Sequence, residues 1–158
     1  MFHQRREMLI VGLGVFVQLI LGRWLPSPWL VPDLTLVGVL LVMARMPQHS
    51  LGPALMAGLL VMAVTVQQSL VVGLAYVGAG GLMRLLSSWW DLADPFLQPM
   101  ALALAEAFLL VIWFLLGVPI TLGLLLLGGL RLLVTVASLL LVRLLIPSSS
   151  APSPIHSS

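Results

Sequence analysis

Two opposite charges in a strongly apolar part of the chain are the residues best placed to do chemistry. Glu106 stands 12 residues before Val118, and Arg131 stands 13 residues after it. On two helices joined by a turn at 117–119, both side chains lie roughly 18–20 Å from that turn. A lone charge at the centre of a bilayer costs at least about 2.5–3.5 kcal/mol. We therefore predict an intramembrane ion pair between Glu106 and Arg131. Two alternatives stay open: that the side chains face different helices or an interface, and that they act as a proton relay or as the counter-ion of a substrate.

Other residue types that carry chemistry lack the partners they need. The chain contains no Cys, which excludes disulfides, Cys-ligated zinc and thiol catalysis. His3, His49 and His156 do not have the spacing of metal ligands. The glycine-rich stretch 78–81 has no strand before it and no Lys after it, so it is not a phosphate-binding loop. We predict no catalytic residue, no metal and no cofactor.

The composition requires lipid as the solvent for most of the chain. Apolar residues make up 61% of it and charged residues 8%, with a mean hydropathy of +1.18. A soluble domain carries about 25% charged residues. All seven basic residues are Arg spread along the sequence, without the basic patch that nucleic-acid binding needs. We predict an integral membrane protein of the all-α class that contacts membrane lipid and does not bind nucleic acid.

Six apolar runs, each near the roughly 20 residues that cross a bilayer, organise the sequence. They form one predicted transmembrane domain over 1–146, followed by a Ser/Pro-rich cytoplasmic tail over 147–158 that we expect to be disordered. Ser50 is the expected N-cap of the third run, and Asp94, before Pro95, is the expected N-cap of the fifth. Runs three and four have a second possibility, a re-entrant pair divided by Gln67-Gln68-Ser69. The expected spans are 8–25, 29–46, 51–66, 70–86, 96–116 and 120–145.

The arginines predict the orientation of these spans. With the N-terminus in the cytoplasm and six crossings, one Arg falls outside and one within a span, whereas five fall on the cytoplasmic side, which is the positive-inside pattern. Both termini are then cytoplasmic. Tryptophans at the expected interfaces (24 and 29 outside, 89 and 90 inside, 113 near the outer end of the fifth span) agree with this orientation. The five cytoplasmic residues are Arg5, Arg6, Arg45, Arg84 and Arg143.

Small and polar residues recur at helical spacing in the first and sixth spans. Such stripes allow close approach of helices and interhelical hydrogen bonds. We predict that they pack helices within the chain, with a partner-protein interface as the competing interpretation. The stripes comprise Gly14, Gln18 and Gly22 in the first span, and Gly128, Thr135 and Ser138 in the sixth.

The order of these features resembles the MreD family, the small membrane subunit of the bacterial rod-shape (elongation) system. A short basic N-terminus and one apolar helix precede Pro32-Asp33-Leu34, where the family typically carries a Pro-Asp-Leu step. Gly73 and Tyr76 follow in the fourth span, which ends near Arg84, and a two-helix unit finishes at Arg143. The similarity covers about 1–146. The chain departs from the pattern late in the third span, where Thr65 and Gln67 replace an acidic residue.

This resemblance implies a scaffold without chemistry of its own in the bacterial inner membrane. Its expected partners are an MreC-like protein, the actin-like MreB and a peptidoglycan polymerase–transpeptidase pair. Pro32 and Asp33 are then structural residues at the outer end of the second span, where we expect Asp33 simply to cap a helix. The alternative is a substrate-binding S-component of an energy-coupling-factor vitamin transporter, an architecture that the MreD family resembles. A third possibility is a permease that uses Glu106 and Arg131.

Overall fold

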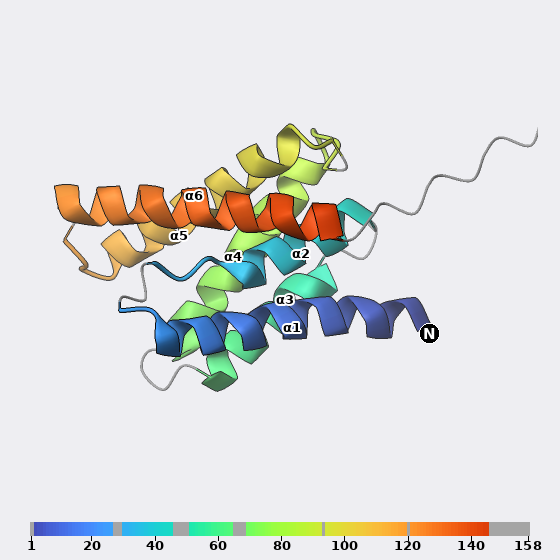
Figure 1. Ribbon diagram of the computed structural model, residues 1–158, viewed down its shortest axis with the longest axis horizontal. Coiled ribbons are helices and arrows are strands. Elements are labelled where there is room, and N and C mark those ends of the chain that lie inside the picture. Colours follow the sequence, from blue (N-terminus) through green and yellow to red (C-terminus); the bar gives the residue numbers. More distant parts are fainter. Residues whose placement is uncertain are drawn as a thin grey trace, which may run out of the picture.

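The described part of the chain is all-helical. A computed structural model describes residues 2–26, 30–45, 51–64, 69–92, 94–119 and 121–145, with side chains from residue 8 onward except those of Leu51 and Ser69. Helices α1 and α6 lie along the long axis of the molecule, whereas α4 runs steeply across it (Figure 1). Their bounds are α1 Phe2–Trp24, α2 Leu34–Arg45, α3 Leu51–Val64, α4 Ser69–Ser87, α5 Leu97–Leu115 and α6 Leu122–Leu145.

Helix α2 lies at the centre of the bundle. It packs against all five other helices, and nine of its 12 residues are buried. Leu36, Leu40 and Met43 from this helix are among the largest fully buried side chains. A helix that is apolar on every side buries all of its faces only when protein surrounds it, which is the position that α2 occupies.

Three of the helices are long and apolar enough to cross a membrane: α4 from Leu70 to Ser87, α5 over its whole length, and α6 over its whole length. Only three of the 24 residues of α6 are buried inside the protein, and Leu126, Leu133 and Leu144 are among its exposed side chains. A soluble protein rarely exposes such a surface, so these helices are typical of a membrane protein. Three shorter apolar helices accompany them, over Met8–Trp24, Leu34–Arg45 and Gly52–Val64.

Helix α2 is much shorter than the span predicted over 29–46. Its 12 residues rise only about 18 Å, against a hydrocarbon core about 30 Å thick. The helix begins at Leu34 because Asp33 is its N-cap: the Asp33 carboxylate accepts from the Leu36 N–H, and the Asp33 carbonyl accepts from the Val37 N–H. The chain therefore enters α2 by a non-helical segment inside the bundle.

Basic residues mark one end of the molecule. Arg45, Arg84 and Arg143 lie in the last turns of α2, α4 and α6. The C-terminal ends of these three helices point toward the side of Figure 1 where the N-terminus lies. Arg23 lies in the last turn of α1, which points the opposite way.

Helix α5 starts later than predicted. Asp94 is not its N-cap: the cap position is Phe96, which makes no side-chain cap, and the helix begins at Leu97. The Asp94 side chain instead accepts a 2.8 Å hydrogen bond from the Phe96 N–H in the preceding turn. The predicted N-cap Ser50, the break at Gln67 and Gln68 and the tail over 147–158 lie outside the described residues.

Candidate functional site

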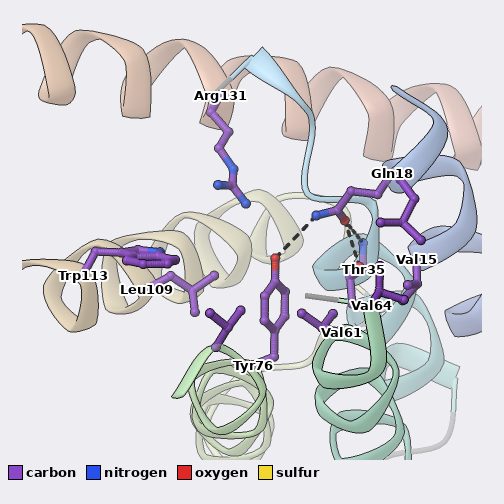
Figure 2. Close-up of a pocket in the computed structure, with 11 residues that line it drawn as sticks. Val15, Gln18, Thr35, Val61, Val64, Tyr76, Leu109, Trp113 and Arg131 are labelled. Carbon is purple, nitrogen blue, oxygen red and sulfur yellow. Dashed lines mark hydrogen bonds between the residues drawn. The ribbon is translucent and has the colours of Figure 1, made fainter. Parts of the chain in front are cut away.

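A buried ionic network lies where the non-helical entry to α2 meets α4 and α6. One oxygen of Asp33, Oδ2, is 2.6 Å from the Arg131 guanidinium and accepts a 2.6 Å hydrogen bond from the Tyr76 hydroxyl. Asp33 is fully buried, and 15% of the Arg131 side chain is exposed. Figure 2 shows Arg131 reaching down from α6 toward the Tyr76 hydroxyl, which points up from α4. Charge-assisted hydrogen bonds of this length are among the strongest that proteins make.

The same network caps the buried start of α2. The first N–H groups of a helix have no partner within the helix, and buried ones must find side chains. Asp33 Oδ1 accepts from the Leu36 N–H at 3.0 Å, and Gln18 Oε1 of α1 accepts from the Thr35 N–H at 3.0 Å. The Asp33 N–H donates to the Thr135 hydroxyl of α6, also at 3.0 Å. Side chains of α1 and α6 thus bond backbone N–H groups at the start of α2.

Glu106 lies on the other side of Arg131. Its Oε1 is 3.6 Å from Arg131 Nε, within ion-pair range and too long for a hydrogen bond. Neither atom has a hydrogen-bond partner among the described residues. Asp33 is therefore the closer partner of Arg131, which the pairing predicted from equal depth on α5 and α6 did not include.

The expectation that Asp33 simply caps a helix is confirmed for one of its oxygens and incomplete for the other. The carboxylate does cap α2 through Oδ1, but Oδ2 holds the only acidic contact of Arg131 shorter than 3 Å among the described residues. Arg131 is ten residues into the 24-residue α6, so Asp33 lies beside the middle of a long helix.

Most of the residues predicted to pack helices lie at contacts, to different degrees. A Cβ on Gly14 would be 2.6 Å from the Leu34 carbonyl oxygen, which places α1 against the start of α2. Gly128 is buried against Leu110 of α5, whereas the exposed Gly22 is close only to Val31. Ser138 donates to the Val134 carbonyl of its own helix and makes no interhelical bond within the described part of the chain.

The residues that carry the family resemblance divide into two groups. Asp33 and Tyr76 belong to the network, and Gly73 is buried where α4 meets α3. Arg84 is exposed near the end of α4, away from the network. Pro32 is buried and Leu34 is half-buried, and together they frame Asp33.

Two signals in the sequence point to the network. Tyr76 is the only Tyr of the chain and stands in an apolar run, where its hydroxyl needs a partner. Gln18 is likewise a polar side chain inside an apolar helix, and its amide bonds Thr35 and, at 3.5 Å, Tyr76 (Figure 2). What the sequence lacks is the relative rotation of α1, α2, α4 and α6, which selects these partners.

No group of three His, Cys, Asp or Glu side chains able to hold a metal occurs in the described ranges. No protein-family model matches the chain, and neither a curated protein nor a solved structure is similar enough to count as a relative. The functional argument therefore rests on the residues themselves.

Proposed function

We propose that this chain is a non-enzymatic membrane scaffold subunit of the MreD type. The observation that carries the proposal is the position of the Pro32-Asp33-Leu34 step, on which the resemblance rests. Its Asp33 bonds Tyr76 of α4 as well as Arg131 and Thr135 of α6. A motif whose side chain holds three helices together suits a protein whose role is to keep a fixed shape for its partners.

The hydrogen-bond partners of the buried charged side chains favour a scaffold over an enzyme. Both oxygens of Asp33 accept hydrogen bonds from the chain itself, and Oδ2 also holds the closest contact of Arg131. Removing one member of a buried ion pair leaves an uncompensated charge, which costs about 3–5 kcal/mol. A network built in this way fixes the rotation of α2 and α6 around each other and has little freedom to take part in a reaction.

The proposed topology is six spans with both termini in the cytoplasm of a bacterial cell. Its support is the collection of Arg45, Arg84 and Arg143 at helix ends that point to the side of the N-terminus. A bias of Arg toward one side is the positive-inside pattern. The short helices α2 and α3 reach a full crossing only together with the segments that flank them.

Cysteine labelling tests this topology, because the natural chain contains no Cys. We expect Ser88→Cys, after α4, to react with a membrane-impermeant maleimide only in opened cells. Leu116→Cys, after α5, should react in intact cells. Labelling of both positions from the same side would overturn the six-span arrangement.

In this proposal the subunit binds an MreC-like membrane protein and, through it, MreB and the peptidoglycan polymerase–transpeptidase pair. The test is affinity purification from native membranes in mild detergent, with mass spectrometry of the bound proteins. Recovery of an MreC-like protein with wall-synthesis enzymes is the expected result. Recovery of ATPases with a shared transmembrane coupling subunit would instead identify a vitamin-transporter component.

A further inference from the structure

A cavity of about 150 Å³ lies beside the network at the point where all six helices converge. Its polar wall is formed by Gln18, Thr35, Tyr76 and Arg131, and valines and leucines from α1, α3, α4 and α5 form the rest together with Trp113. Leu19 and Val64 at its edge are about 40% exposed, so the cavity reaches the surface of the protein. Figure 2 shows Trp113 and Arg131 on one side of the Tyr76 ring and Gln18 on the other.

The hydrogen-bonding groups on the polar wall are unequal: donors of Gln18 and Arg131 remain, whereas the Thr35 hydroxyl oxygen is the acceptor left beside them. Gln18 Oε1 already accepts from the Thr35 N–H and from its hydroxyl, at 3.0 and 2.8 Å. The Gln18 amide nitrogen makes only the 3.5 Å contact to Tyr76. Arg131 has five N–H groups, more than its contacts with Asp33, Glu106 and the Tyr76 hydroxyl use. A ligand in this cavity therefore meets free donors and needs to bring an acceptor.

The charge of the wall excludes ionic ligands. Arg131 already faces two carboxyl groups, Asp33 at 2.6 Å and Glu106 at 3.6 Å. An anion would compete with the Asp33 ion pair, and a cation would be repelled by the Arg131 guanidinium, which lines the cavity whereas Asp33 and Glu106 do not. An uncharged oxygen acceptor avoids both costs, because it bonds the donors without displacing an ion pair.

We propose that this cavity binds a small uncharged molecule, or the uncharged end of a larger one, that carries a carbonyl or ether oxygen on a compact apolar body. The oxygen accepts from Gln18 and Arg131, and the apolar body packs against Val61, Val72 and Trp113. A cavity of about 150 Å³ accommodates a body of roughly the size of benzene. The proposal depends on the geometry of the cavity and not on which assembly the protein joins.

The test uses cyclohexanone as the probe and Trp113 as the reporter. The full-length protein is labelled with 5-fluorotryptophan in lipid nanodiscs, and the Trp113 signal is identified in the ¹⁹F NMR spectrum from its loss in Trp113→Phe. We expect cyclohexanone to shift the Trp113 signal to saturation. Half-saturation should come at a concentration about five- to tenfold lower than for methylcyclohexane, the factor that one net hydrogen bond contributes. Trp24 and Trp89 are 84% and 74% exposed and report ordinary partitioning into lipid.

Variants and charged probes decide the result. Val72→Phe fills the cavity and should abolish the saturable shift, whereas Leu74→Phe, at a position 60% exposed on the same helix, should leave it unchanged. Val64→Phe serves as a second filling variant if Val72→Phe does not fold. The proposal is overturned by a shift that does not saturate, by one that the filled variants retain, or by equal binding of methylcyclohexane. Binding of cyclohexanecarboxylate or cyclohexylammonium as tight as that of cyclohexanone would also overturn it.

Discussion

Helices α3 and α4 are held together in a different way from helices α2 and α6. At the first interface side chains are missing: a Cβ on Gly58 would lie 2.7 Å from the Gly73 carbonyl oxygen, and one on Gly73 would lie 2.9 Å from that of Gly58. Gly80 likewise contacts Ala54 too closely for any added side chain. At the second interface the contact is made by Asp33, Arg131 and Thr135.

This difference shows two ways to associate helices where lipid removes the hydrophobic driving force between them. Small residues let two backbones approach and gain dispersion contacts over a wide area. Charged groups act at a single depth, but their partners are fixed, since an unpaired charge in that position is costly. The glycine interface therefore determines how close α3 and α4 lie, whereas the ionic network determines which face α6 turns to the bundle.

Loss of Asp33 should have the largest effect on stability. Asp33→Ala removes the partner of Arg131, the acceptor of Tyr76 and the cap of Leu36 together. We expect a loss of about 3–5 kcal/mol in the free energy of unfolding, as for other broken buried ion pairs. Reversible unfolding in mixtures of SDS and mild detergent measures it. Asp94→Ala, which breaks one hydrogen bond in a surface turn, is the matched control, and an equal loss there would contradict a special role for Asp33.

Double-mutant cycles should rank the two carboxylates that face Arg131. For Asp33→Asn with Arg131→Gln we expect a coupling energy near the upper end of the usual range of about 0.5–3 kcal/mol for contacting residues. For Glu106→Gln with Arg131→Gln the coupling should be near the lower end, because the 3.6 Å separation is not a hydrogen bond. The loss in the Asp33–Arg131 double variant should be clearly smaller than the sum of the two single losses. A larger coupling for Glu106 would reverse the assignment of the primary partner.

The glycine interface should respond to a single methyl group. Gly58→Ala places a Cβ against the backbone of α4, and we expect it to destabilise the protein by about 1–3 kcal/mol, as overpacking does. Gly81→Ala is the control on α4, where an added Cβ meets nothing within 4 Å. There the better helix propensity of Ala should leave stability unchanged or raise it by up to about 1 kcal/mol. Similar losses in both variants would show that helix propensity and not close approach explains the result.

The smallest expected effect is a difference in stability between variants of two hydroxyl residues on α6. Thr135→Val leaves the buried Asp33 N–H without its acceptor, and we expect a cost of about 1–3 kcal/mol, toward the lower end because the backbone can relax. Ser138→Ala removes only a bond to the Val134 carbonyl of the same helix and should change stability by less than about 0.5 kcal/mol. Unfolding of both variants under the same conditions gives the comparison. Equal effects would mean that Thr135 does not support the start of α2.

The six apolar runs could be recognised from the sequence because their length and composition are local properties. The predicted limits of the later runs differ little from those of the helices, with 70–86 against Ser69–Ser87 and 120–145 against Leu122–Leu145. The second run is the exception. Its first residues, before Leu34, are not part of α2, and the local signal for this boundary is Pro32-Asp33, which opens the regular helix as its residue types predict.

Part of the candidate site could be predicted from the sequence. Equal depth on α5 and α6 follows from counting residues, and it brought Glu106 and Arg131 together in the prediction. The contact of Arg131 with Asp33 spans 98 residues of sequence, and depth alone does not reveal it. It requires α2 to start in the middle of the bundle and Arg131 to face inward.

The sequence by itself determined that lipid surrounds this protein, that it is helical, and that an arginine and a glutamate share one depth in its interior. Each of these follows from composition or from distance along a chain, which need no partner. Only the tertiary structure decided that Asp33 is the closer partner of Arg131, that Tyr76 and Thr135 complete the pair, and that a cavity lies beside them. The physical reason is that a buried charge selects its partner by the rotation and offset of helices, and these are set by the packing of all six together.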